Sequence, residues 1–187
     1  MSAFTQALNH TLNREGGYSN HPSDLGGETF RGISRRNHPE WEGWAILDSY
    51  PADKRKELQG DPELAGLVAQ FYRVNYWDQL SLDGIEATSI ACELFDTAVN
   101  VGTTRAARWL QHVANLLGDV NLVEDGKIGP KTLEAVNALN RKLTYVPMLK
   151  ALNGMQFEHY HQIILNNSSQ RVFFRGWLTR VWEWAKE

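Results

Sequence analysis

The segment from residue 15 to residue 34, EGGYSNHPSDLGGETFRGIS, gathers the side chains best suited to chemistry. It contains five glycines together with the carboxylates of Glu15 and Asp24 and the hydroxyl of Thr29. Glycine loses more conformational freedom on folding than any other residue, so a plain surface loop rarely keeps so many glycines beside so many polar groups. We therefore interpret the segment as an active-site turn that holds Glu15 opposite Asp24.

Glu15 is the candidate general acid. Hydrophobic periodicity predicts a helix over residues 3–15, whose last turn carries about half a negative charge on its unpaired carbonyls. That field, together with burial against Tyr18 or a tryptophan, raises the pKa of the Glu15 carboxyl. A carboxyl that stays protonated near neutral pH can donate its proton to the oxygen of a glycosidic bond.

Asp24 and Thr29 are the candidates for the other half of such a reaction. Asp24 follows Glu15 by nine residues, across a Gly and Pro turn that can fold back to the same cleft. A second carboxylate can orient water or stabilise the positive charge of the transition state, and the Thr29 hydroxyl could hold that water. Glu28 is an alternative second carboxylate. A purely structural interpretation also stays open, because Asp beside Gly is an ordinary turn former.

The motif EGGYSN followed by SDLGGETFRGIS resembles the signature of the glycoside hydrolase family 108 lysozymes, which are N-acetylmuramidases found largely as phage endolysins and in prophages. The order Glu, Asp, Thr is also similar to that of the phage-type lysozymes, in which an acid Glu ends a helix. The resemblance implies that Glu15 is the general acid and that Asp24 and Thr29 position water. Thr29 follows Asp24 by five residues, one fewer than in the phage-type lysozymes.

The second half of the chain extends this resemblance. The motifs DTAVNVG, WLQHVANLL and DGKIGPKTLEAV, within residues 96–136, resemble the peptidoglycan-binding pattern usual in the second half of the same family. The resemblance implies a catalytic lobe over residues 1–95 and a helical peptidoglycan-binding-like lobe over residues 96–187, packed together as one compact unit. Whether the DGKIG loop binds substrate itself or only caps its helix stays open.

Four further side chains are candidates for substrate binding, namely Tyr18, Trp77, Asp96 and Asn100. Asp96 and Asn100 share one face of a predicted helix and could bind hydroxyl or acetamido groups. An equal alternative is a polar strip hydrogen-bonded to a neighbouring helix. Trp77 could line a sugar groove, although aromatic residues at helical spacing more commonly belong to the core.

Composition excludes several other classes of function. A net charge of −3 gives no overall attraction to nucleic acid, and the single Cys92 permits neither an intrachain disulfide nor a cysteine-based metal cluster. The six histidines lack the spacing of a metal site. We therefore expect a monomer that uses no metal, cofactor or nucleic-acid partner.

The sequence shows no apolar run long enough for a transmembrane helix and no secretory signal at its start. We therefore expect the protein to stay in the host cytoplasm until it is released, and then to act on the cell wall or in the periplasm.

Periodicity predicts a mainly α-helical chain, and the resemblance implies a lysozyme-like fold of two lobes with a small irregular β-hairpin near the active site. The hairpin is expected over residues 29–34. Ser2, Asp61 and Thr104 are the expected N-caps of their helices. Helices are expected over residues 3–15, 52–59, 62–76, 86–100, 104–117, 130–139, 146–165 and 171–186.

The last predicted helix, residues 171–186, combines aromatic with basic side chains. A helix of this composition can lie on an anionic membrane. A helix that packs onto the protein core would look similar, and this docking is the interpretation we favour over weak membrane contact.

The residues predict a glycoside hydrolase, and the resemblance implies an endolysin-type muramidase that hydrolyses the β-1,4 bond between N-acetylmuramic acid and N-acetylglucosamine in peptidoglycan. A lytic transglycosylase is the nearest alternative, since it needs one acid/base Glu and no water-holding Asp. A peptidoglycan-binding or scaffolding protein without turnover is the third possibility. The motif argues against a binding protein without turnover, because such a protein has no need of a carboxyl group whose pKa is raised.

Overall fold

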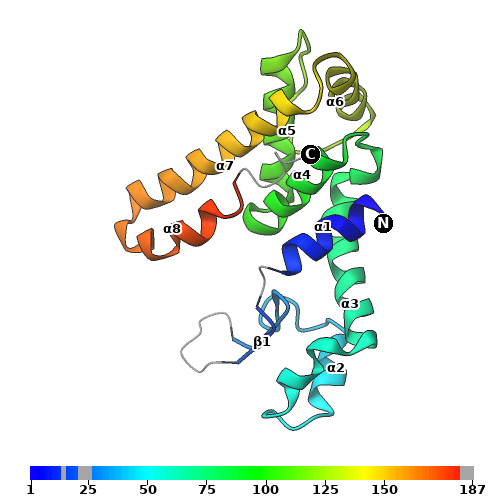
Figure 1. The fold of residues 1–187 in the computed structure, drawn as a ribbon, viewed down its shortest axis with the longest axis vertical. Helices are drawn as coiled ribbons and strands as arrows, with labels where there is room; N and C mark the ends of the chain where they lie inside the picture. The colour runs from blue at the N-terminus through cyan, green and yellow to red at the C-terminus, as the bar shows by residue number, and fades with distance from the viewer. Residues whose placement is uncertain (14–15, 21–26, 182–187) are drawn as a thin grey trace. The chain divides into compact units, whose positions relative to one another are not determined.

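The computed structural model of the chain describes residues 1–13, 16–20 and 27–181 (Figure 1). The chain divides by packing into a first unit, Met1–Asn75, and a second unit, Tyr76–Glu187. The described residues form a mainly helical fold with a small three-stranded antiparallel sheet, which confirms the predicted fold class.

The first unit contains the sheet and the helices that support it. Its helices are α1 (Ala3–Leu12), α2 (Gly43–Asp48), the 3-10 segment η1 (Arg55–Gly60) and α3 (Pro62–Tyr72). Its strands are β1 (Tyr18–Ser19), β2 (Thr29–Phe30) and β3 (Ile33–Ser34). A π-helical segment, η2 (Arg73–Trp77), follows α3.

The three strands form an antiparallel sheet in the order β1-β2-β3. β2 and β3 are joined by Arg31 and Gly32, whose φ angles of 45° and 82° are both positive. Positive φ at both central residues is typical of the type I′ turn. The twist of this turn matches the right-handed twist of the two strands that it joins. The strained Arg31 backbone is held in place because its N–H donates to the Gly17 carbonyl at 3.0 Å and its carbonyl accepts from the Tyr72 hydroxyl at 2.9 Å.

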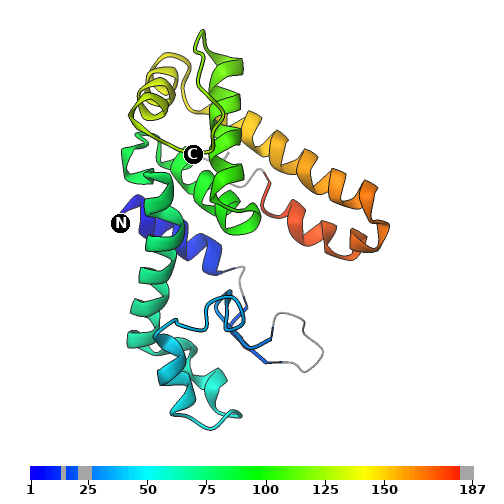
Figure 2. The same cartoon turned by 180° about the vertical axis from the view of Figure 1, so that it is seen from behind.

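The second unit contains helices joined by loops, with no strand among its described residues. It comprises η3 (Asp78–Leu80), η4 (Leu82–Gly84), α4 (Thr88–Val101), α5 (Thr103–Leu117), α6 (Pro130–Leu143), α7 (Val146–Asn166), η5 (Ser168–Gln170) and α8 (Arg171–Leu178). Every residue of α4 from 89 to 98 is buried, so α4 is the core helix of this unit. Figure 2 shows α8 returning alongside α7 after the turn that contains η5.

N-cap residues explain where three of the helices begin. The Ser2 hydroxyl accepts from the Thr5 N–H, and the Asp61 carboxylate accepts from the Leu64 N–H at 2.9 Å, as expected of N-caps. The prediction for Thr104 is wrong, because Thr104 lies inside α5, which begins at Thr103 with Gly102 as its N-cap. Gly102 has a φ of 90°, a conformation that glycine adopts without steric cost because it lacks a Cβ atom.

Several predicted boundaries differ from those observed. The helix predicted over residues 3–15 ends at Leu12, with Asn13 as its C-cap. The six-residue α2 was not predicted, since it spans fewer than two turns and shows little periodicity. Of the helix predicted over 171–186, α8 covers Arg171–Leu178, and residues 182–186 lie outside the described residues.

Candidate active site

Two of the three predicted catalytic residues, Glu15 and Asp24, lie outside the described residues. In sequence, Glu15 falls between α1 and β1, and Asp24 falls in the connection between β1 and β2. The structure therefore describes the elements on either side of both carboxylates, and it describes the third residue, Thr29, directly.

Thr29 lies in the central strand β2, where its backbone pairs with Ser19 of β1 and Ser34 of β3. Its hydroxyl donates to the Gly27 carbonyl at 3.3 Å. A hydroxyl has one proton and two acceptor lone pairs, so this bond leaves the lone pairs of Thr29 to accept from a water molecule. The water-holding role of Thr29 stays a prediction.

The register of the sheet reveals two hydroxyl neighbours that the sequence analysis missed. Ser19, Thr29 and Ser34 are direct cross-strand partners, and side chains that lie directly opposite one another share a face of the sheet. The alternating positions Tyr18, Phe30 and Ile33 are buried. One face of the sheet thus packs on the core while the other carries a row of three hydroxyls, from Ser19, Thr29 and Ser34.

Glu28, the alternative second carboxylate, is held by a network of polar side chains. One of its oxygens accepts from the Tyr18 hydroxyl at 2.8 Å and from Arg55 at 2.7 Å, and the other forms an ion pair with Arg35 at 2.8 Å. The side chain is only 10% exposed. Because both oxygens are engaged, Glu28 ties the start of β2 to η1, which is a structural role.

Asp48 completes this network from the end of α2. Both of its oxygens accept from Arg35, at 2.7 and 3.0 Å, and one also pairs with Arg55 at 3.1 Å. The hydrogen bonds from Arg35 and the charges of both arginines hold the pKa of the Asp48 carboxyl below its usual value, against the opposing effect of burial. Arg35 and Arg55 therefore balance the charges of Glu28, inside the predicted active-site segment, and of Asp48, outside it.

Tyr18, a predicted substrate-binding residue, combines burial with a place in a pocket wall. It is 8% exposed and lines a pocket of about 390 Å³. The other lining residues are Ser19, Asn20, Ala52, Asp53 and Lys56. Since the Tyr18 hydroxyl is already donated to Glu28, any contact with substrate would use the ring; this role stays a prediction.

Trp77 lies in the core of the second unit. It has no exposed surface, its indole N–H donates to the Asp83 carboxylate at 2.9 Å, and its ring lies 5.8 Å from that of Phe95. These contacts match the core interpretation, since a ring with no exposed surface cannot stack on a sugar.

Asp96 and Asn100 both contact Arg180. The Asp96 carboxylate, 2% exposed, pairs with the Arg180 guanidinium at 2.9 Å. The Asn100 amide, with its oxygen turned to the guanidinium, accepts from Arg180 at 2.8 and 3.0 Å. The sequence analysis held a polar strip bonded to a neighbouring helix as the alternative to substrate binding; the partner observed, Arg180, follows the end of α8. A role in binding stays a prediction for both residues.

The DGKIG loop is fixed to α5 by Gln111, which is 1% exposed. The Gln111 amide nitrogen donates to the Asp125 carboxylate at 2.8 Å and to the Lys127 carbonyl at 2.9 Å. Its amide oxygen accepts from the Gly126 N–H at 2.9 Å. The hydrogen bond from Gln111 and one from the Lys127 backbone lower the pKa of the Asp125 carboxyl. The loop is therefore anchored to the preceding helix rather than to the one that follows it.

Within residues 1–13, 16–20 and 27–181, no group of three or more His, Cys, Asp or Glu side chains could hold a metal ion. In the same part of the chain, no helix has the length and apolar character needed to cross a membrane.

Comparison with known families shows the class of protein to which this fold and site belong. Residues 8–102 match the family model described as Glycosyl hydrolase 108, and residues 105–182 match the one described as Predicted Peptidoglycan domain. The two matches define a glycoside hydrolase that acts on peptidoglycan. Because the first covers just over half of the chain, the protein belongs to glycosyl hydrolase family 108.

A solved structure agrees with this assignment. The structure of SagA from Brucella abortus shares 30% sequence identity, with a TM-score of 0.65 over 95% of this chain and 88% of that one. No match was found among curated protein sequences.

The family segments and the packing units divide the chain at different places. The two family segments meet between residues 102 and 105, at the junction of α4 and α5, whereas the packing units meet between residues 75 and 76. The predicted boundary at residue 95 falls between these two positions, inside α4, and stays a prediction.

Proposed function

We propose that the protein is an endolysin-type muramidase that hydrolyses the β-1,4 bond between N-acetylmuramic acid and N-acetylglucosamine, with Glu15 as its general acid. The observation that carries this proposal is the match of residues 8–102 to the glycosyl hydrolase family, since that segment contains Glu15, Asp24 and Thr29. The hydrogen bonding of Thr29 supports it.

In this mechanism the Glu15 carboxyl donates its proton to the glycosidic oxygen as the bond to the anomeric carbon breaks. The Asp24 carboxylate stabilises the positive charge that develops on the sugar and accepts a proton from the attacking water. The Thr29 hydroxyl, whose own proton is directed to the Gly27 carbonyl, accepts a hydrogen bond from the other O–H of that water, which stays with the oxygen. The oxygen of water ends on the anomeric carbon, and the leaving sugar keeps the proton from Glu15.

The proposed biological role is lysis of the host cell. The enzyme would be held in the host cytoplasm until another component releases it, and it would then cleave the glycan strands of the wall.

The variant Glu15→Gln tests the assignment of the acid, because the amide keeps the shape of the side chain and cannot donate the proton. We expect the rate of turbidity loss of a peptidoglycan suspension to fall by about 10²-fold or more. Glu40→Gln is the matched control, since the Glu40 side chain is 76% exposed in the same unit. Near-normal activity of Glu15→Gln would overturn the assignment.

A further inference from the structure

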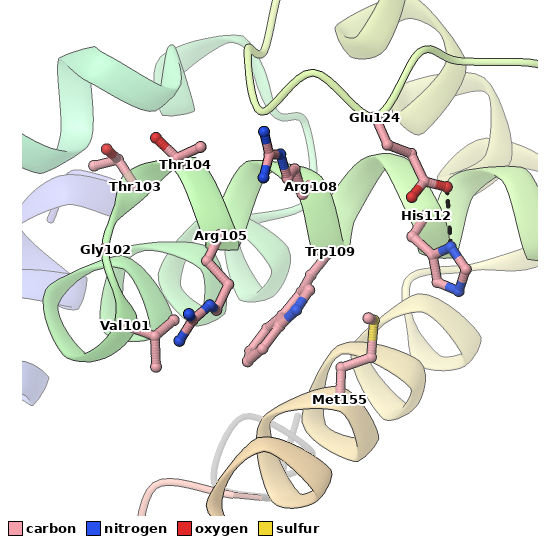
Figure 3. Close-up of a pocket in the computed structure, with 10 residues that line it drawn as sticks. All are labelled: Val101, Gly102, Thr103, Thr104, Arg105, Arg108, Trp109, His112, Glu124 and Met155. Carbon is pink, nitrogen blue, oxygen red and sulfur yellow. Dashed lines mark hydrogen bonds and ion pairs between the residues drawn. The ribbon is translucent and has the colours of Figure 1, made fainter. Parts of the chain in front are cut away.

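The second unit carries a groove on α5 that the catalytic mechanism does not use (Figure 3). The groove has a volume of about 640 Å³, and Arg105, Arg108 and Trp109 of α5 line it together with Met155 of α7. A neighbouring pocket of about 520 Å³ shares Arg105, Trp109 and Met155 and reaches His159. The two pockets form one open surface along α5 and α7.

Two arginines give this surface its chemistry. Arg105 and Arg108 are three residues apart on α5 and therefore lie on neighbouring positions of one helix face. Both are exposed, and Arg108 forms no ion pair or hydrogen bond with the described part of the chain. Arg108 is thus a positive charge without a protein counter-ion among the described residues.

Arg105 is held by a neutral partner. Its guanidinium lies 3.1 Å from the Nε2 atom of His159. Burial, with a further contribution from the charge of Arg105, lowers the pKa of His159, so the ring is neutral at neutral pH and Nε2 can accept the hydrogen bond. This contact orients Arg105 without cancelling its charge.

Both carboxylates that line this surface have their own partners; Glu158 accepts from Gln162 and pairs with His161 on α7. Glu124 lies 2.9 Å from His112, and the hydrogen bond with His112 lowers the pKa of the Glu124 carboxyl. The two arginines therefore remain available to a ligand. Beside them, Trp109 is half-buried, and its ring contacts that of His159 at 5.7 Å between centroids.

Peptidoglycan offers one component that matches this surface. Where each muramic acid carries a peptide its lactyl carboxyl is bound in an amide and the glycan is neutral, whereas the short stem peptides carry free carboxylates. A guanidinium matches a carboxylate through two parallel hydrogen bonds, and a tryptophan ring supplies apolar contact area. We propose that this groove binds the stem peptides of peptidoglycan, with Arg105 and Arg108 pairing with their carboxylates and Trp109 packing against the peptide. The inference rests on the proposed action on peptidoglycan and names the part of it that the second unit recognises.

Direct binding to an isolated peptide tests this inference without any hydrolysis. The probes are the tetrapeptide L-Ala–γ-D-Glu–meso-diaminopimelate–D-Ala, its form with all carboxylates amidated, and an oligomer of N-acetylglucosamine as a glycan without carboxylates, each titrated by calorimetry. We expect the full-length protein to bind the tetrapeptide, with at least tenfold weaker affinity in the double variant Arg105→Ala, Arg108→Ala and for the amidated peptide. The double variant with lysine at both positions should lose part of the affinity, since lysine keeps the charge but cannot donate the two parallel hydrogen bonds of a guanidinium.

The matched control removes the same charge elsewhere in the second unit. Arg171 and Arg175 are exposed on α8, so the double variant Arg171→Ala, Arg175→Ala should bind the tetrapeptide as the wild type does. An equal loss in both double variants, full retention of binding in the Arg105 and Arg108 variant, or preference for the N-acetylglucosamine oligomer would each overturn the inference. Hydrolysis of peptide-free glycan reports separately on the proposed function, because it depends on Glu15 and not on the groove.

Discussion

Glu28 shows how a carboxylate next to a catalytic motif can serve the fold. Sequence alone left Glu28 and Asp24 as rivals for one role, because both are acidic residues in the same glycine-rich segment. The structure shows that Glu28 makes contacts that no local pattern reveals, while Asp24 lies outside the described residues. Arg35 and Arg55 come from separate later segments of the chain, and both reach Glu28.

We expect Glu28→Gln to lower the free energy of unfolding by about 2 kcal/mol, because it removes the charge from hydrogen bonds with two arginines in a largely buried position. Urea denaturation measures this change. Activity per folded molecule should be kept, whereas Asp24→Asn should lose activity without losing stability. Glu40→Gln, at an exposed carboxylate, should change stability by less than about 0.5 kcal/mol. A loss of activity in Glu28→Gln with unchanged stability would contradict this assignment.

His159 makes stability depend on pH. Its pKa is lowered in the folded state by burial first and then by the charge of Arg105. In the unfolded chain the imidazole pKa is about 6.5, so between the folded pKa and that value the unfolded state binds more protons. Stability in this window therefore falls as the pH falls.

We expect the stability advantage of the wild type over His159→Gln to shrink as the pH is lowered from about 7 to 5, since the variant has no imidazole to protonate at this site. The comparison between the two proteins cancels the effect of the other histidines. Urea denaturation at several pH values measures it. Parallel stability curves for the two proteins would show that the His159 pKa is not lowered.

At the scale of elements, local patterns predicted the long helices well. The helices α4, α5 and α7 were found within two residues of their observed ends, because their apolar residues repeat at helical spacing. The sheet was harder, since each strand has two residues and its register depends on partners that are distant in sequence. The row of hydroxyls beside Thr29 follows from that register and could not be read from the chain.

The groove on α5 carried a signal that the sequence analysis did not use. The run R-A-A-R-W places Arg105, Arg108 and Trp109 at spacings of three and four residues, which lie on one helix face. Such a face reads equally well as a solvated surface, and only the positions of Met155 and His159 on α7 turn it into a groove.

The helix α8 bears on the choice between docking and membrane contact. Trp177 stacks on Tyr160 of α7 with 5.2 Å between ring centroids, and Phe174 lies 6.3 Å from Phe157. Part of its aromatic face therefore packs on α7, as the docking interpretation requires. Val172 and Phe173 remain exposed on the same helix, at 78% and 54%.

Gln111 fixes residues 125–127 of the 119–129 loop to α5 through three hydrogen bonds, and Asn115 of α5 bonds Leu122 earlier in the same loop. We expect Gln111→Ala to lower the free energy of unfolding by about 3 kcal/mol, since it leaves buried polar groups of the loop without partners. Gln162→Ala is the control; Gln162 is exposed and bonds only Glu158 one turn away in its own helix. Similar urea midpoints for Gln111→Ala and the wild type would show that the loop does not depend on this anchor.

At the scale of the whole molecule, the family matches account for almost the entire chain, and they agree with the resemblance found in the sequence motifs. Motif density made this possible, since glycines, carboxylates and a hydroxyl occur together in residues 15–34. The burial of individual side chains could not be predicted from motifs. Trp77 and Asp96 carry side chains suited to sugars, and their tertiary neighbours place both in the interior.

The products of the complete enzyme distinguish hydrolysis from transglycosylation. Hydrolysis adds the oxygen of water to the anomeric carbon of muramic acid, whereas a lytic transglycosylase closes an internal anhydro ring and gives a product lighter by one water. Because Asp24 and Thr29 are proposed to hold the attacking water, we expect reducing ends that carry the label when digestion runs in ¹⁸O-water, measured by mass spectrometry. Thr29→Val keeps the side-chain shape without the hydroxyl and should slow the reaction while leaving the product type unchanged. Anhydro ends without label would contradict hydrolysis. They would identify the protein as a lytic transglycosylase, which needs Glu15 but no residue that holds water.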